Sequence, residues 1–297
     1  MQRPATELIT ERFSSRTYVP KPIEPDLLRP LTDALSANTA GPFGSHARFV
    51  LIVASEREPD RLKRLGTYGF IKGATGFIVG TVQRGPKDME DYGHLLEQIV
   101  LSATDLGLGT CWLGGSFTKS SFADRIALTA TETMPAIVAT GHIDGTTTKE
   151  QIRRRPLSRR LPAAQLFFEG GFGTPIDLGA TRDDTAGAAA GDDTVPRLLE
   201  AVRWAPSASN KQPWRIVRDG DDWHFYLQRT KGYGKGSLLF SALHLADLQR
   251  VDMGIAMCHF ELAARELGLA GAWVLEEPHL ALPGPGVEYT STWRASA

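Results

Sequence analysis

Two short segments, far apart in the chain, carry polar residues suited to holding a ligand. The first, RFSSR at residues 12–16, places Arg12, Ser14 and Arg16 at alternate positions. In an extended backbone these three side chains point to one side. Two guanidinium groups that flank a hydroxyl form a cradle for a phosphate, whereas the alternative is an ordinary exposed basic segment.

The second segment, WAPSASNKQPW at residues 204–214, crowds turn-forming residues between two tryptophans. Such a density of turn residues predicts a loop that holds something by its backbone. Its hydrogen-bonding side chains are Ser207, Ser209, Asn210 and Gln212. A purely structural helix-to-strand connection is the alternative interpretation.

Two further stretches could contribute to a binding site. CWLGGSF at residues 111–117 ends a predicted strand in two glycines, where the backbone could approach a flat ring; a simple turn would have the same composition. RRRPLSRR at residues 153–160 holds five arginines. One or two of them would be enough for a phosphate, and the pattern does not choose among them.

Composition narrows the function classes. Of 297 residues, 42% are apolar and 23% charged, and 33 basic against 34 acidic residues leave a net charge of -1. This balance is typical of a globular protein and argues against nucleic acid as a partner. No apolar run reaches the ~18 residues of a membrane span, and no signal peptide is apparent, so we expect a soluble, cytoplasmic protein.

The sequence offers no metal or nucleophile motif. The seven histidines and two cysteines show no metal-ligand spacing, and no GxSxG turn occurs. We therefore predict no metal site and name no catalytic acid, base or nucleophile.

The chain repeats itself. SATDLGLGTCW, ending at Trp112, matches LAARELGLAGAW, ending at Trp273, and each follows an amphipathic helical pattern. Gly107 and Gly268 occupy the position of a helix C-terminal glycine. Upstream, PLTDALSANTAGPFGSHARFVLIV parallels RLLEAVRWAPSASNKQPWRIV as helix, loop and strand. Two matches in the same order indicate an internal duplication, although chance similarity of two amphipathic helices is the alternative.

The pattern also predicts the domain boundaries and the fold class. Residues 171–193 have the Gly, Ala and Asp composition of a linker, so we predict repeat one at 1–170 and a shorter repeat two at 194–297. Further strands are expected at 76–82, 136–143 and 223–228. Strands mixed with helices without regular alternation favour an α+β fold.

Together these motifs resemble the FMN-dependent nitroreductase family. Members open with Arg-x-Ser-x-Arg/Lys, carry an APSxxNxQPW loop, show a helix running into GLGTCW and glycines, and have basic residues before PL. Here the matching segments are residues 12–16, 205–214, 106–115 and 153–157. The combination is specific although each part is not, and it covers most of the chain.

The chain departs from the family pattern in one respect. In the resembled family two subunits build each flavin site, one with the Arg-Ser segment and the other with the Asn-Gln-Pro-Trp loop. Here repeat one keeps residues 12–16 but has NTAGPFGSHARF at 38–49, whereas repeat two keeps the loop but lacks the Arg-Ser segment. The resemblance therefore implies a fused dimer, an intramolecular pseudo-dimer with one surviving flavin site, that works as a monomer.

The resemblance implies FMN as cofactor and NAD(P)H as electron donor. It assigns to the flavin site Arg12, Phe13, Ser14, Arg16, Leu113, Gly114, Gly115, Arg153, Arg154, Arg155, Pro206, Ser207, Ala208, Ser209, Asn210 and Gln212. The implied reaction is a ping-pong, two-electron reduction of a nitroaromatic, quinone or similar small-molecule acceptor.

Three other functions stay open at this point. One is a flavin-binding protein without turnover. Another is a cofactor-free interaction protein that uses the arginine-rich stretch as a docking patch. A flavin-modifying activity, such as flavin fragmentation, is the third.

Overall fold

The structure is a computed structural model of the chain. It describes residues 1–53, 69–115, 119–146, 159–176, 178, 193–231 and 246–296. The helices are α1 (Ala5–Glu11), α2 (Pro25–Ala37), α3 (Asp88–Asp105), α4 (Lys119–Ile126), α6 (Thr194–Arg203) and α8 (Leu248–Glu266), with short 3-10 turns η3 (Ala163–Gln165) and η4 (Ala208–Asn210). The strands are β1 (Ala47–Val53), β2 (Gly76–Gln83), β3 (Gly109–Leu113), β4 (Glu132–Thr133), β5 (Ile137–Gly141), β6 (Phe167–Glu169), β7 (Trp214–Asp219), β8 (Asp222–Gln228), β9 (Gly271–Val274) and β10 (Val287–Ala295).

Two sheets share one strand order. The first sheet runs β1-β2-β5-β3, with β4 paired to β2, and the second runs β6-β7-β8-β10-β9. When β4 and β6 are set aside, the first two strands of each sheet in chain order pair with each other, and the last strand lies between the second and the third. All these pairs are antiparallel except β6 with β7. We call residues 1–146 the first half and residues 193–296 the second half.

β6 connects the two halves. It follows the first half in sequence but adds to the second sheet, with Phe167 paired to Ile216. Residues 171–176, at the start of the predicted linker, fold back onto this strand, and Ile176 N–H donates to the Phe167 carbonyl at 2.9 Å. Most of the remaining linker lies outside the described residues.

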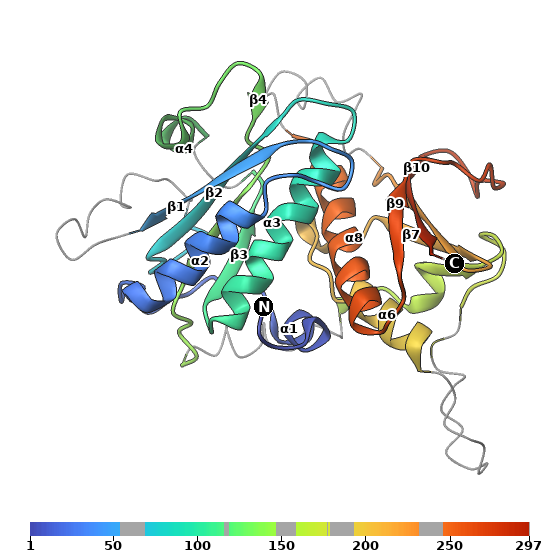
Figure 1. Ribbon diagram of the computed structural model, residues 1–297, viewed down its shortest axis with the longest axis horizontal. Coiled ribbons are helices and arrows are strands. Elements are labelled where there is room, and N and C mark those ends of the chain that lie inside the picture. The colour runs from blue at the N-terminus through green and yellow to red at the C-terminus, as the bar shows by residue number, and fades with distance from the viewer. Residues whose placement is uncertain are drawn as a thin grey trace, which may run out of the picture.

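Helices α3 and α8 lie side by side between the sheets (Figure 1). A Cβ on Gly254 would lie 1.9 Å from the Glu90 carbonyl oxygen, and one on Gly93 would lie 2.2 Å from that of Val251. The two glycines therefore let the two backbones approach more closely than any other residue would allow. The contact is reciprocal, because each helix presents its glycine to the backbone of the other.

Both central helices end in the same motif. After α3, Gly107 has φ +75° and donates to the Thr104 carbonyl, while Leu108 N–H donates to Ala103. After α8, Gly268 has φ +78° and the following Leu269 N–H reaches back to Ala264. Both are Schellman caps, in which glycine avoids the steric cost of positive φ. The expected C-terminal glycines are confirmed.

One hydrophobic core spans both halves. Apolar side chains of α3, such as Leu96 and Ile99, pack with Phe260 of α8 and with inward-facing residues of the second sheet. Phe260 contacts Phe225 and Trp293 edge to face, a favoured aromatic geometry. Because the halves share this core, we expect them to unfold as one unit.

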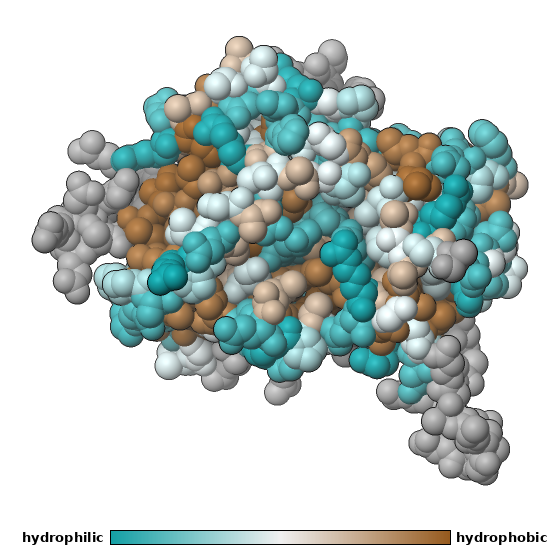
Figure 2. All heavy atoms as spheres, viewed as in Figure 1, coloured by the Kyte–Doolittle hydropathy of each residue, from teal (hydrophilic) through white to brown (hydrophobic). Residues whose placement is uncertain are grey.

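The structure confirms the expected fold class and strands. The mixed α+β architecture is present. β2 and β8 cover the strands predicted at 76–82 and 223–228, and β5 lies within the one predicted at 136–143. Polar and apolar residues are interspersed over the face shown in Figure 2. None of the helices in the described part of the chain combines the length and the apolar character needed to cross a membrane.

A candidate ligand site between the two halves

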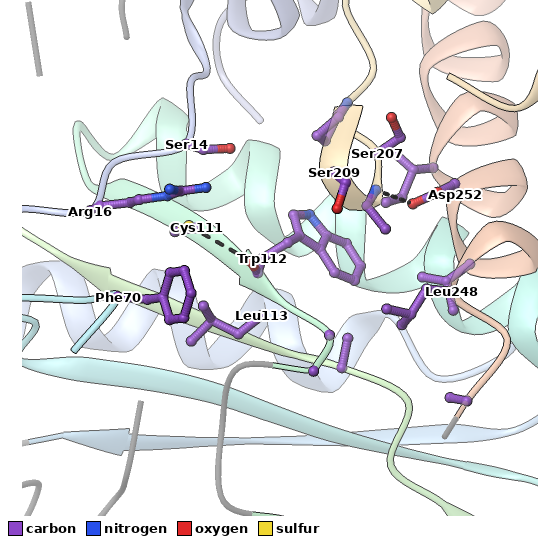
Figure 3. A pocket seen from close by; sticks show the side chains of 18 residues that line it. Ser14, Arg16, Phe70, Cys111, Trp112, Leu113, Ser207, Ser209, Leu248 and Asp252 are labelled. Atoms are coloured by element: carbon purple, nitrogen blue, oxygen red, sulfur yellow. Dashed lines mark hydrogen bonds between the residues drawn. The ribbon is translucent and has the colours of Figure 1, made fainter. Parts of the chain in front are cut away.

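A cavity of about 470 Å³ lies between the two halves (Figure 3). Its volume is within the range of small-molecule and cofactor sites. The first half contributes Ser14, Arg16, Phe70, Cys111, Trp112, Leu113, Gly114, Gly115 and Ala136. The second half contributes Pro206, Ser207, Ala208, Ser209, Ala246, Leu248, Val251, Asp252 and Ile255.

The segment of residues 12–16 reaches this cavity because it lies beside β3. Ser14 forms an isolated parallel bridge with Thr110, and Ser15 N–H donates to the Thr110 carbonyl at 2.9 Å. This pairing holds the segment extended, so Ser14 and Arg16 approach the cavity from the same side (Figure 3). Their alternate spacing thus brings two of the predicted residues together.

Arg12 lies behind this segment, in the protein interior. The residue is only 5% exposed, and its Nε atom lies 3.7 Å from Glu97 Oε1. Nε and Nη1 have no hydrogen-bond partner among the described residues. Burial lowers the pKa of Arg12, although Glu97 opposes this shift. Arg12 and Phe13 line a second, smaller hollow of about 250 Å³ and are not part of the interface cavity.

The end of β3 supplies backbone to the cavity, as the two glycines predicted. A Cβ on Gly114 would lie 2.4 Å from a Leu248 methyl group, so this glycine lets α8 approach β3. At Gly115 a Cβ would meet nothing within 4 Å. The backbone there is open on the side where a side chain would otherwise stand.

The loop after α6 is strained and well braced. Ser209, Asn210 and Gln212 all have positive φ, between 50° and 56°, which is unusual for residues other than glycine. The Gln212 N–H donates to Ser207 Oγ at 2.9 Å and closes the loop. Strain of this kind persists only where surrounding contacts hold it, and it is concentrated at functional sites.

Asn210 and Gln212 supply those contacts. Asn210 Nδ2 donates to the Arg159 carbonyl, and its Oδ1 accepts from Arg160 Nη1 at 3.0 Å. Gln212 Oε1 accepts from the Leu161 N–H at 2.8 Å. These two side chains therefore join the loop to the end of the arginine-rich stretch, whereas Pro206 to Ser209 line the cavity.

The arginine-rich stretch is only partly described. Arg153, Arg154 and Arg155 lie outside the described residues. Arg160 donates to the carbonyls of Ala205 and Trp204. Burial, together with the nearby Arg12 and Arg203, lowers the pKa of Arg160 to about 10. Glu200, which pairs with Arg203, opposes part of this shift.

Trp112 and Phe70 are lining residues that the sequence reasoning missed. The Trp112 ring lies at the cavity and donates its indole N–H to Glu97 Oε2 at 2.7 Å. Phe70 is 53% exposed at the cavity. Flat aromatic rings at this position are suited to contact a conjugated ligand. Trp112 lies in the segment CWLGGSF, whose glycines were already predicted to approach a ligand. Its position next to them could therefore have indicated that it lines the cavity.

Asp252 is a third missed residue. It lines the cavity from α8, is 3% exposed, and accepts the Ala208 N–H through Oδ1 at 2.9 Å. Its partner in the internal repeat is Asp91, since 252 − 91 = 161 is the offset that also relates Trp112 to Trp273. This shared offset could have indicated from the sequence that Asp252 has a counterpart in the other repeat. Among the described residues, no group of histidine, cysteine and acidic residues could hold a metal ion.

Comparisons with known proteins agree with the motifs. The family model described as "Putative TM nitroreductase" matches residues 5–166 and 187–264, well over half of the chain. A "putative nitroreductase" structure from Thermotoga maritima matches with a TM-score of 0.60 and 18% identity, over 99% of this chain and 94% of that chain.

Shorter structures match about half of the chain. A "putative nitroreductase" from Desulfovibrio desulfuricans in complex with FMN has a TM-score of 0.39 and 25% identity, over 53% of this chain and 95% of that chain. No curated protein matches. The family model spans both halves and confirms the resemblance inferred from the motifs, so the chain belongs to the nitroreductase family described as "Putative TM nitroreductase".

Proposed function

We propose that the protein is an FMN-dependent NAD(P)H oxidoreductase that reduces nitroaromatic, quinone or similar conjugated acceptors by two electrons, in ping-pong order. One flavin would bind in the cavity between the halves. The observation that carries this proposal is the cavity itself, because the Arg-Ser segment of the first half and the Pro-Ser-Ala-Ser loop of the second half line one space.

The residues present fit a flavin with a phosphate. Ser14 and Arg16 line the cavity, and Arg160 lies near Arg12 and Arg203, with Glu200 opposing their charge. Arg12 stands behind the cavity wall and has two nitrogen atoms without hydrogen-bond partners among the described residues. An anionic phosphate near these groups would offset their charge. Arg16 and Ser14 would hold the same part of the cofactor, and we propose that one or more of Arg153, Arg154 and Arg155 join them.

The apolar part of the cavity fits a flat ring. Leu113, Gly114 and Gly115 would bring backbone beside the ring, and Pro206 to Ser209 would contact it from the second half. When bound, FMN supplies the redox chemistry, accepting two electrons from NAD(P)H and passing them to an acceptor. The protein groups bind and orient the reactants and exclude water, so no dedicated acid or base needs to be assigned.

We propose that the chain is a fused dimer with repeats at 1–170 and 194–297 joined by 171–193. A single chain then completes one site, and a monomer with one FMN is sufficient. A light-scattering mass near 32.4 kDa and a stoichiometry of one FMN per chain are expected. A mass near twice that value would contradict the proposed monomer.

The visible spectrum of the chain tests the function most directly. The protein is reconstituted with FMN, desalted, and recorded anaerobically before and after addition of NADH or NADPH. We expect a retained flavin band that bleaches with the donor and returns when a quinone is added. Loss of the band on desalting would contradict FMN binding, and a retained band that does not bleach would contradict the oxidoreductase.

A further inference from the structure

Asp91 and Asp252 occupy equivalent places on α3 and α8. Asp91 binds the loop that precedes β1, and Asp252 binds the loop that precedes β7. Asp91 accepts two backbone N–H groups, from Phe43 at 2.9 Å through Oδ1 and from Ser45 at 2.8 Å through Oδ2. Both of its oxygens are therefore satisfied as acceptors. This is the pattern of an ionised carboxylate.

Asp252 is satisfied on one side only. Its Oδ1 accepts from the Ala208 N–H, whereas the buried Oδ2 has no hydrogen-bond partner among the described residues. A charged carboxylate that is buried with one oxygen unpaired is strongly disfavoured. A carboxylic acid would need one acceptor for its proton and would keep the bond from Ala208.

The charged groups around Asp252 do not compensate a negative charge. Asp247, at the start of α8, adds like charge, and its own partner is Arg229. Arg250 of the same helix pairs with Asp88 and Glu90 of α3. No ion pair joins Asp252 to a cation within the described part of the chain. Burial, with Asp247 as a smaller cause, raises the pKa of Asp252 well above its usual range.

From the first half, Arg16 and Cys111 are the other titratable residues of the cavity wall. Neither is hydrogen-bonded to Oδ2 of Asp252. The loop contributes Ser207 and Ser209, of which Ser207 Oγ already accepts from Gln212. Since Oδ2 has no partner among the described residues, we look for the acceptor of its proton in a ligand that fills the cavity.

We propose that Asp252 is a neutral carboxylic acid that donates a hydrogen bond from Oδ2 to an oxygen or nitrogen acceptor of a flavin bound between the halves. This inference rests on the proposed function, because it takes the flavin as the ligand. It makes Asp252 a binding residue with two tasks: its Oδ1 holds the loop and its Oδ2 recognises the ligand.

Paired substitutions test the protonation state without any ligand. Asp252→Asn keeps the shape, an acceptor for Ala208 and a donor, so we expect thermal stability at least equal to that of the unchanged protein. Asp91→Asn is the matched control and should destabilise, because it turns an amide NH2 group toward a backbone N–H. If both substitutions destabilise alike, Asp252 is a carboxylate and the proposal is overturned.

The pH dependence of stability shows whether folding raises the pKa of Asp252. A group whose pKa is raised by folding contributes stability that is present below its unfolded pKa of about 3.8 and is lost as the pH rises through its folded pKa. The gain from Asp252→Asn should therefore be absent near pH 4 and grow toward neutral pH. A gain that does not change with pH would contradict the proposal.

FMN binding tests the hydrogen bond. Fluorescence quenching of FMN gives a Kd for the unchanged protein, for Asp252→Asn and for Asp252→Leu, which has neither donor nor acceptor. We expect the Asn variant to bind within about twofold and the Leu variant to lose about tenfold, the equivalent of roughly 1.4 kcal/mol. Equal binding by the Leu variant, or equal loss in both variants, would overturn this inference while leaving FMN binding established.

The assay also separates the two hypotheses. If the unchanged protein does not bind FMN, the proposed function fails and this inference fails with it. If it binds FMN, lumiflavin, which lacks the ribityl phosphate, locates the acceptor. A tenfold gap between the Asn and Leu variants that persists with lumiflavin supports an acceptor on the ring, and a gap seen only with FMN supports one on the side chain.

Discussion

Glu97 and Glu261 make a matched pair across the contact between α3 and α8. Glu97 accepts the indole N–H of Trp112, from its own half, and lies 3.0 Å from His259 Nε2 of the other half. Glu261 accepts from Trp273 in its own half, and it lies 2.8 Å from His94 Nε2 across the contact.

The two carboxylates differ in what else they touch. Glu97 is fully buried, faces Arg12, and through Trp112 reaches the wall of the interface cavity. Glu261 instead pairs with the exposed Arg265. It stands 12 residues before its tryptophan, against 15 for Glu97 (273 − 261 and 112 − 97), a displacement of about one helical turn.

The two halves share the elements that make up the fold but differ in those that line the cavity. Strand order, central helices, helix caps and the reciprocal carboxylates are present in both halves. The cavity described above lies on the side of Glu97, whose partners Arg12 and Trp112 belong to or lie beside the segments that line it, together with residues 206–209 of the loop. Duplication thus explains how the halves pack, and the local departures from it explain where the cavity lies.

The largest expected effect comes from the buried member of the pair. Glu97→Gln leaves the buried Arg12 without its countercharge and should cost about 3–5 kcal/mol of stability. Glu261→Gln should cost only about 1–2 kcal/mol, because Arg265 can turn to water. Urea unfolding followed by circular dichroism measures both, and equal losses would contradict the asymmetry.

Substitutions at the two glycines where α3 and α8 touch should, by contrast, cost similar amounts of stability. Gly93→Ala and Gly254→Ala each place a methyl group against the backbone of the facing helix. We expect each to destabilise by about 1–3 kcal/mol through overpacking. Gly171→Ala, where a Cβ meets nothing within 4 Å, is the control and should stay within about 0.5 kcal/mol. A harmless change at either central glycine would argue against a close two-sided contact.

The two tryptophans should differ in ligand binding. Trp112→Phe and Trp273→Phe remove equivalent indole bonds, so their losses of stability should be similar. Only Trp112 lines the cavity, and its loss should weaken FMN binding by about tenfold. Isothermal titration with FMN distinguishes them. Weakening by Trp273→Phe would place the ligand elsewhere.

The smallest effect concerns acid stability. Burial opposes ionisation of Glu261, but His94, Trp273 and Arg265 outweigh it and lower its pKa. Its contribution is therefore present above its usual pKa of 4.5 and is lost as the pH falls through the lower folded value. Thermal melts between pH 3 and 6 should show a weaker pH dependence for Glu261→Gln. An unchanged slope would contradict this assignment.

Much of the scaffold could be predicted from the sequence. Local signals were sufficient to predict that Gly107 and Gly268 end their helices, because the positive φ at these positions favours glycine. They were also sufficient to predict the strands that are rich in β-branched residues. The duplication followed from matching segments. The position of β6 in the second sheet was not foreseen, since its parallel pairing with β7 depends on long-range packing.

Site residues could be predicted from the sequence where a recognisable motif lines the cavity. Ser14, Arg16, Gly115 and the residues 206–209 were named from their patterns and line one cavity. The direction in which Arg12 turns, and the bracing bonds of Asn210 and Gln212, depend on residues remote in sequence. Asp252 lies within a regular helical pattern, where a lone acidic residue carries no local signal of being buried.

We propose that both halves build one flavin site, and the FMN affinity of three variants tests this. Gly115→Trp fills the cavity from the first half and Ala208→Trp fills it from the second, whereas Gly171→Trp is a matched control outside the lining. We expect each of the first two to weaken FMN binding by at least about tenfold and the control to bind as the unchanged protein does. Normal binding by either cavity variant would contradict the shared site.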